Sequence, residues 1–290
     1  MEAQHVDPAS TIGRKNYMNG AQRLGKNING YFGEKIEINP VLTDCIVSGQ
    51  AHGWQVEEIS VPTKPNLVAL TRSVSRDHLR QGTNEARPTS RIYISAGIHG
   101  DEPAGPLAVR QLLQENAWPA DVNLWLLPCL NPTGFRLHRR ENAEGLDLNR
   151  QYLHPEAGEV RAHMGWLKEQ PAFDLCLCLH EDWESHGFYV YELNPDNQPS
   201  LAGAIVDRVA EVCPLDPSGI IEGRPAHNGI IRPSVDPHSR PQWPEAFHLL
   251  AHKTRLSYTL EAPSDFPLPV RVSALVTAVR AAVEQSAKAR

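Results

Sequence analysis

The sequence has few cysteines, no excess of basic residues and no long apolar run. Its five cysteines are odd in number and lie mostly in apolar segments, whereas a secreted disulfide framework is denser and the chain shorter. The 28 Lys and Arg against 34 Asp and Glu give a net charge of −6, which argues against nucleic acid or an anionic membrane as a partner.

No apolar stretch approaches the roughly 18 residues of a membrane helix, and the start lacks the basic and apolar regions of a signal peptide. We therefore expect a soluble, cytoplasmic protein.

Apolar strand-like runs alternate with helical patterns along the rest of the chain. Strands are predicted at 54–61, 66–74, 91–97, 122–130, 173–180, 187–193 and 255–261, and helices at 102–117, 156–170, 200–212, 243–253 and 270–290. This alternation predicts a three-layer α/β/α fold with a mixed, mostly parallel central sheet. We expect one domain over 1–290, in which 1–50 form an irregular N-terminal extension and 214–240 a long loop.

A histidine and a glutamate follow the strand at 91–97, in the stretch "SAGIHGDEPAG". His99 and Glu102 lie just past the carboxyl end of this strand, where open α/β sheets bind ligands. An imidazole and a carboxylate are two of the three protein ligands of a His₂Glu catalytic zinc. The alternative is a surface loop that happens to carry these two side chains.

A second histidine ends the strand "FDLCLCLH". Side chains alternate along a strand, so Cys176, Cys178 and His180 share one face. Either the thiols bind metal, or they are small buried residues beneath a metal-binding His180. We favour the second interpretation, because buried cysteine usually behaves as a small hydrophobe.

An arginine-rich run, "NPTGFRLHRRENAEGLDLNRQY", spans 131–152. It is either a solvated loop or part of a site in which one guanidinium binds a substrate anion and another stabilises an oxyanion. Asp147 is placed to accept the second N–H of a ligand histidine. Glu261 closes the strand in "SYTLEAPSD" and is either an edge residue in water or a general base that deprotonates a zinc-bound water.

Taken in order, these motifs resemble those of the zinc carboxypeptidases of the carboxypeptidase A superfamily. They are especially similar to the compact bacterial members, near the murein-peptide amidases and the aspartoacylase/succinylglutamate desuccinylase group. The matching residues are "HGDE", "NPTGF", the arginine run, "DLNR", "CLH" and "SYTLE", between 92 and 262.

The resemblance implies a zinc carboxypeptidase-like fold and one bound Zn²⁺. Its ligands would be His99, Glu102 and His180, and Glu261 would be the general base. Asp147 matches the residue that orients the first histidine.

The same resemblance assigns the substrate-binding groups. Asn149 and Arg150 match the pair that binds a terminal carboxylate. Counting back from "DLNR" selects Arg140 as the electrophile, whereas counting forward from "NPTGF" selects Arg139. We prefer Arg140 because the loop is short.

Three functions follow as hypotheses. The first is a zinc-dependent hydrolase of an amide bond next to a free carboxylate, of the carboxypeptidase or amidase type. The second is an N-acyl amino acid deacylase of the aspartoacylase type, and the third a non-catalytic binding protein on the same fold. For the two enzymes the partner is a small peptide or an N-acyl amino acid with a free carboxylate. No substrate-capping tyrosine is assigned, because Tyr189 and Tyr191 lie in a predicted strand.

Overall fold

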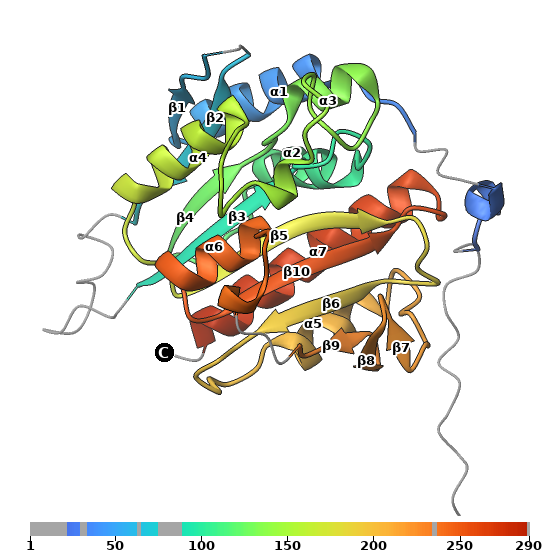
Figure 1. The fold of residues 1–290 in the computed structure, drawn as a ribbon. Coiled ribbons are helices and arrows are strands. Elements are labelled where there is room, and N and C mark those ends of the chain that lie inside the picture. The colour runs from blue at the N-terminus through green and yellow to red at the C-terminus, as the bar shows by residue number, and fades with distance from the viewer. Residues whose placement is uncertain (1–21, 30–33, 63–64, 75–88, 234–236, 289–290) are drawn as a thin grey trace, which may run out of the picture.

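A computed structural model describes residues 22–29, 34–62, 65–74, 89–233 and 237–288 (Figure 1). Ten strands of these residues form one sheet in the order β1-β2-β4-β3-β5-β10-β6-β9-β8-β7. The strands are β1 (Gln55–Ile59), β2 (Leu67–Arg72), β3 (Ser90–Ala96), β4 (Val122–Leu127), β5 (Leu175–Asp182), β6 (Tyr189–Leu193), β7 (Ile220–Ile221), β8 (Arg224–His227), β9 (Ile230–Ile231) and β10 (Ser257–Pro263).

The centre of the sheet is parallel and its flanks are largely antiparallel. Strands β4, β3, β5 and β10 pair in parallel, while β1 and β2 form the predicted antiparallel hairpin at one edge. Beyond β10, β6 runs antiparallel and the short β6–β9 pair is parallel. The mixed sheet is confirmed. Because its central strands are parallel, the carboxyl ends of four strands lie side by side at one end of the sheet.

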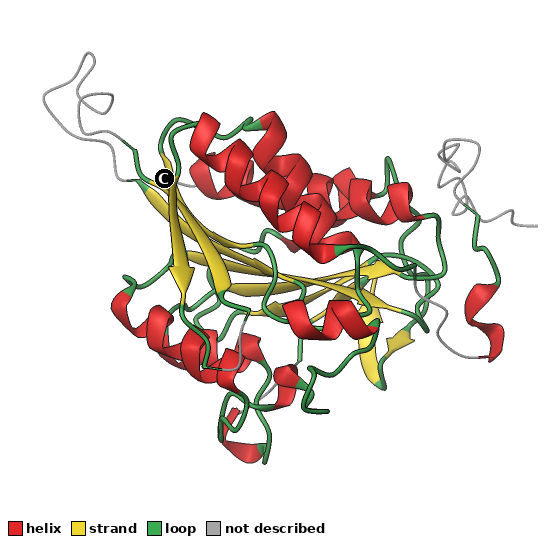
Figure 2. Cartoon of the chain, turned by 90° about the horizontal axis from the view of Figure 1, so that it is seen from above, coloured by secondary structure: helices red, strands yellow, loops and turns green. Residues whose placement is uncertain are grey.

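Helices cover both faces of the sheet, which confirms the three-layer fold (Figure 2). On one face lie α1 (Ile38–Ala51), α2 (Ala104–Glu115), α5 (Ala202–Val209) and α7 (Leu268–Lys288), which share one apolar cluster with the sheet. On the other lie α4 (Gly158–Glu169) and α6 (Glu245–His252), with a second cluster. The short helix α3 (Pro132–Leu137) follows β4 in the chain.

The prediction of an irregular segment over 1–50 is wrong for its last part. Residues 38–50 belong to α1, whose buried Ile38, Val41, Cys45 and Gly49 recur at intervals of three or four, the period of one helix face. Residues 1–21 and 30–33 lie outside the described residues. The single domain stays a prediction, although every described strand joins the same sheet.

The predicted loop at 214–240 also contains regular structure. Strands β7 and β8 form a hairpin whose two turn residues, Glu222 and Gly223, have φ of 51° and 69°. Such left-handed pairs match the twist of a two-residue hairpin. With β9, this hairpin extends the sheet beyond β6 and contributes side chains to the cavity described below.

Across the described ranges, we find no helix with both the length and the apolar character that a membrane crossing requires.

Candidate metal centre

The turn between β3 and α2 carries His99 and Glu102. Gly97 has a φ of 62°, and a Cβ on Gly100 would lie 2.1 Å from the carbonyl carbon of Gly134. Both glycines are therefore required: one for a left-handed turn, the other for close packing against the "NPTG" segment. The turn places both His99 and Glu102 in buried positions.

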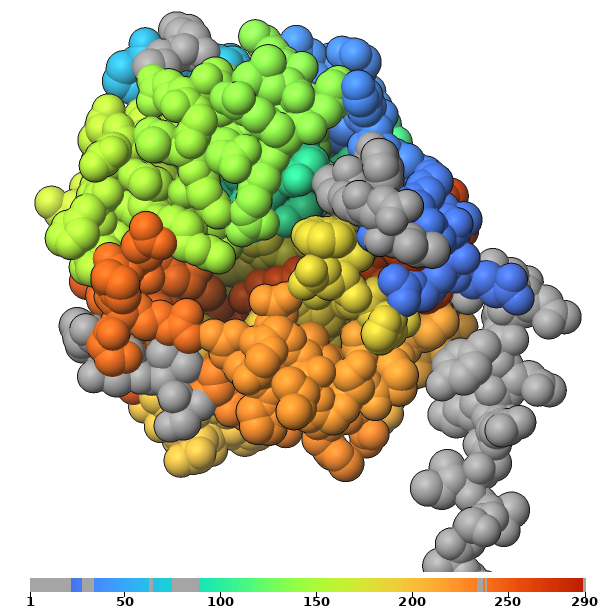
Figure 3. Space-filling model, turned by 45° about the vertical axis from the view of Figure 1, so that its right-hand side comes forward, coloured from blue at the N-terminus to red at the C-terminus, as the bar shows by residue number. Residues whose placement is uncertain are grey.

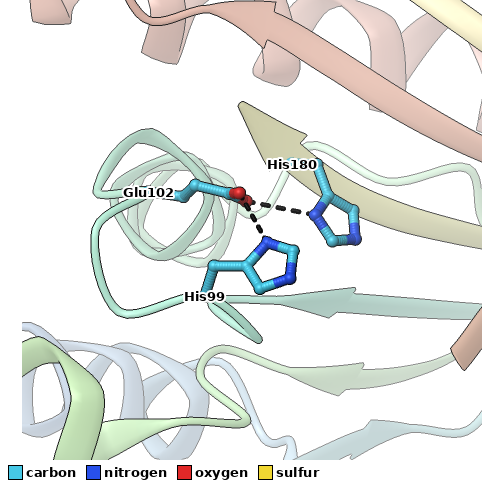
Figure 4. Close-up of side chains that lie close together, drawn as sticks. All are labelled: His99, Glu102 and His180. Carbon is cyan, nitrogen blue, oxygen red and sulfur yellow. Dashed lines mark hydrogen bonds and ion pairs between the residues drawn. The ribbon is translucent and has the colours of Figure 1, made fainter. Parts of the chain in front are cut away.

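His180 meets these two side chains from the neighbouring strand. Because β3 and β5 pair in parallel, with Ala96 opposite Leu179, the end of β5 lies beside the turn. Glu102 Oε1 lies 2.5 Å from His99 Nδ1, and Glu102 Oε2 lies 3.1 Å from His180 Nδ1 (Figure 4). One ligand atom from each residue lies within 4.8 Å of the others. The structure thus brings the three predicted ligands together.

The charges of this cluster suit a divalent cation. Burial alone would raise the pKa of Glu102, but His99 and His180 outweigh it and hold the pKa below its usual range. Two imidazoles and a carboxylate form the donor set of a catalytic zinc site, so the residues present fit the metal. Burial raises the thiol pKa of Cys176 and Cys178 well above its ordinary value. No cysteine joins the metal-capable group found among the described residues.

Asp147 and Arg140 both lie beside His99. Asp147 Oδ1 lies 3.4 Å from His99 Nε2, and Arg140 Nε donates to Asp147 Oδ2 at 2.9 Å. Arg140 Nη1 lies 3.8 Å from Glu102 Oε1, and Arg140 lines the cavity. The Arg139 guanidinium instead donates to the carbonyl of Asn142. Of the two arginines that the sequence left open, Arg140 is the one at the cluster.

A cavity of about 520 Å³ opens above the cluster, at the carboxyl ends of the central strands. Figure 3 shows a hollow between the green surface of residues near 150 and the orange surface of residues near 225. All the predicted site residues except Asp147 line this cavity: His99, Glu102, Arg140, Asn149, Arg150, His180 and Glu261.

Glu261 reaches the cavity from β10, opposite His180 in the parallel register. Burial, with smaller contributions from the negative Glu102 and Asp182, raises the pKa of Glu261 to about 8, although His180 opposes the shift. This carboxyl therefore holds a proton near neutral pH more readily than an ordinary glutamate. A cation beside it would lower that pKa.

Asn149 and Arg150 stand at the cavity wall on a short 3₁₀ turn, Leu148–Arg150. The Asp147 side chain accepts from Asn149 N at 2.9 Å, and Asn149 Oδ1 accepts from Glu245 N at 2.9 Å. Since its oxygen is engaged, Asn149 has its amide N–H₂ left as a donor. Arg150 is exposed, and no described carboxylate forms an ion pair with it.

The sequence analysis assigned no role to several residues of this cavity. Tyr189 and Tyr191 both face it from β6, and the Arg224 guanidinium lies 5.7 Å from the centre of the Tyr191 ring. Trp183 stands exposed at the cavity. The Glu–Gly dipeptide at 222–223 is not one of the usual two-residue hairpin signals, and nothing in the sequence indicated where that hairpin would lie.

Residues 88–206 match the family model described as the succinylglutamate desuccinylase/aspartoacylase catalytic domain. Carboxypeptidase SOL1 of Arabidopsis thaliana is 35% identical over 115 residues, a match that covers 31% of this chain and 22% of that protein's length.

Solved structures share the fold over most of the chain. A candidate metallopeptidase of Shewanella amazonensis superposes with a TM-score of 0.70 at 23% identity, over 88% of this chain and 98% of that one. A metallo-carboxypeptidase of Pseudomonas aeruginosa, in complex with (2-guanidinoethylmercapto)succinic acid, gives 0.61 at 16% identity, over 86% and 69%. Fold and site define an α/β protein with a His₂Glu donor set. The chain shares the fold of these metallopeptidase and metallo-carboxypeptidase structures, in agreement with the resemblance expected from its sequence.

Proposed function

We propose that this protein is a zinc-dependent hydrolase that cleaves an amide bond next to a free carboxylate. The observation that carries the proposal is the convergence of His99, Glu102 and His180 in one cavity with Glu261. The third hypothesis, a binding protein without activity, would not require a carboxyl group at the position of Glu261.

Each residue near the cluster has a role in this proposal. When zinc is bound, it supplies Lewis acidity that lowers the pKa of a water molecule and polarises the scissile carbonyl. Glu261 accepts the proton of the attacking water and delivers it to the leaving nitrogen. Arg140 donates hydrogen bonds to the developing oxyanion. Asp147, whose Oδ1 lies 3.4 Å from His99 Nε2, orients the His99 ring.

The substrate is a small molecule that carries a free carboxylate. The exposed Arg150 guanidinium, which has no acidic partner among the described residues, and the Asn149 amide are the groups that would bind it. The Pseudomonas protein is in complex with a substituted succinic acid, which supports an acid as the ligand of this fold. Both a short peptide and an N-acyl amino acid satisfy this requirement, and the family match over 88–206 favours keeping the deacylase as the second candidate.

The substrate proposal is tested by matched pairs of compounds. Peptides with a free or an amidated C-terminus, and N-acyl amino acids with a free or an amidated carboxyl group, are incubated with the zinc-loaded protein. Losing a charge-assisted hydrogen bond should lower kcat/KM about tenfold to a hundredfold. The pair that is hydrolysed identifies the substrate class. Equal rates on free and amidated compounds would remove Arg150 and Asn149 from substrate binding.

The catalytic role of Glu261 is tested with Glu261→Gln. The variant keeps the shape of the side chain but has no basic oxygen for the proton, so turnover should be lost while zinc stays bound. Glu211→Gln, an exposed site on another part of the surface, should keep the wild-type rate. Normal turnover in Glu261→Gln would exclude the proposed mechanism.

A further inference from the structure

Glu181, the residue after His180, contacts both of the segments that carry metal-ligand side chains. Its main-chain N–H donates to Glu102 Oε2 at 3.1 Å. Its own carboxylate oxygen Oε1 accepts from the main-chain N–H of Ala104 at 2.6 Å. Ala104 is the first residue of α2, so Glu181 joins the end of β5 to the start of that helix.

These two bonds constrain the spacing of the metal ligands. His180 is carried by β5, whereas His99 and Glu102 are carried by the turn that leads into α2. A carboxylate at the N-terminus of a helix accepts an otherwise unpaired main-chain N–H and lies at the positive end of the helix dipole. The Glu181 carboxylate therefore fixes the turn against the strand.

Arg271 stabilises this buried carboxylate by supplying the opposite charge. Glu181 and Arg271 are both almost fully buried, and the Arg271 guanidinium pairs with Glu181 Oε2. Ser264 Oγ also donates to Glu181 Oε2, at 3.3 Å. A buried charge that loses its partner destabilises the fold strongly, so the position of Glu181 depends on Arg271.

The N-terminal segment completes this arrangement. Arg271 Nη2 donates to Glu34 Oε2 at 2.6 Å, so one guanidinium bridges two carboxylates. Glu34 in turn lies 3.2 Å from Lys26 Nζ. Arg23 and the main-chain N–H of Lys26 both bind the buried Asp265, just after β10. Arg23, Lys26 and Glu34 thus contact residues close to the candidate metal centre.

We propose that the Glu181–Arg271 pair, closed by Glu34, is the positioning element that holds His180 and Glu102 at the spacing a single divalent cation requires. The inference rests on the proposed function only in that it needs a bound metal. It also gives the N-terminal segment a role, because Glu34 supplies the second negative charge for Arg271.

The test measures metal binding rather than activity. Zinc affinity is determined for the full chain by competition with a chromogenic chelator, for wild type, Arg271→Met, Arg271→Lys and Glu34→Gln. Loss of a group that orients metal ligands typically weakens metal binding about tenfold to a hundredfold, and this is the change expected for Arg271→Met. Arg271→Lys retains the charge but not the planar fork, so its affinity should lie between those of Arg271→Met and wild type. Glu34→Gln should weaken binding less than Arg271→Met.

A matched control separates positioning from general stability. Arg232 donates to the buried Glu192 at 2.6 Å and lies in the β6–β9 region, so Arg232→Met also removes an arginine from a buried carboxylate. It should lower the melting temperature without changing zinc affinity. The visible spectrum of the cobalt-loaded protein, which reports ligand geometry, should change in Arg271→Met and remain unchanged in Arg232→Met.

The outcomes distinguish this inference from the proposed function. If folded Arg271→Met and Glu34→Gln bind zinc as wild type does, with unchanged cobalt spectra, the positioning role is wrong while the metal site stands. If Arg271→Met does not fold, the zinc affinities and cobalt spectra of Arg271→Lys and Glu34→Gln are compared with wild type instead. Wild-type values in both would show that the positioning role is wrong. If the wild-type chain itself binds no metal, the proposed function fails first.

Discussion

Glu261 sets the pH range of the proposed reaction, because it must be unprotonated to act as a base. Without a cation, burial raises its pKa from 4.5 to about 8. A cation at His99, Glu102 and His180 favours the charged carboxylate and lowers that value. The acid limb of kcat/KM for the zinc-loaded protein should therefore have a midpoint between 4.5 and about 8, with activity lost as pH falls. A profile that stays flat from pH 8 down to pH 4.5 would mean that Glu261 is not the base.

At the scale of single residues, the sequence was most informative where a side chain closes a strand. His99, Glu102, His180 and Glu261 follow or end predicted strands, and the parallel sheet brings those ends to one edge. The Glu181–Arg271 pair could not be predicted in the same way. Its partners are 90 residues apart, and nothing local to either residue indicates the other.

At the scale of elements, helices α4 and α6 cover a polar network between them and the sheet. His163 of α4 lies between two tyrosines, with Nε2 2.9 Å from the Tyr93 hydroxyl and Nδ1 2.7 Å from the Tyr152 hydroxyl. The Tyr93 hydroxyl donates to the buried Glu245 at the start of α6, at 2.8 Å. The network connects β3, α4 and α6, and the Asn149–Glu245 hydrogen bond extends it to the cavity wall.

This network should make stability depend on pH. Burial lowers the pKa of His163 from 6.5 to about 3, so below pH 6.5 the unfolded chain binds a proton that the folded chain excludes. The free energy of unfolding should therefore fall as pH drops from 6.5 toward 3, by up to about 1.4 kcal/mol per pH unit from this group.

Urea unfolding of His163→Asn at several pH values measures that contribution. The variant should be less stable at pH 7 and should lose less stability than wild type between pH 6.5 and pH 4.5. His52→Asn, at an exposed position, should keep the wild-type slope. Equal slopes in wild type and His163→Asn would show that His163 is not held neutral by burial.

Element prediction failed where the local pattern was short or polar. Helix α1 was missed because its apolar period is weak, and only its four buried positions reveal a helix face. Strands β7 and β9 have two residues each, too few for any period to appear. Long apolar runs such as β4 and β5 were found because strands covered on both faces are apolar throughout.

At the scale of the whole molecule, every group that the proposed function needs lies at one end of the sheet, beside the carboxyl ends of its central strands. The carboxyl ends of β3, β5 and β10 supply the metal ligands and the base, the 131–152 segment supplies the arginines, and the β7–β8 hairpin helps to close the cavity. Arg23 and Lys26 bind Asp265, and Glu34 binds Arg271, at the same end of the sheet. The three-layer architecture followed from the alternation of strands and helices, whereas the cavity wall depended on contacts between distant segments.

The central claim is that His99, Glu102 and His180 bind one divalent cation, and the zinc content of the purified chain tests it most directly. After equilibration with a zinc buffer and removal of free metal, elemental mass spectrometry should find one zinc per chain in wild type and in Glu261→Gln. It should find none in a folded His99→Asn/His180→Asn variant. Wild-type protein without zinc, or a double variant that retains it, would contradict the account.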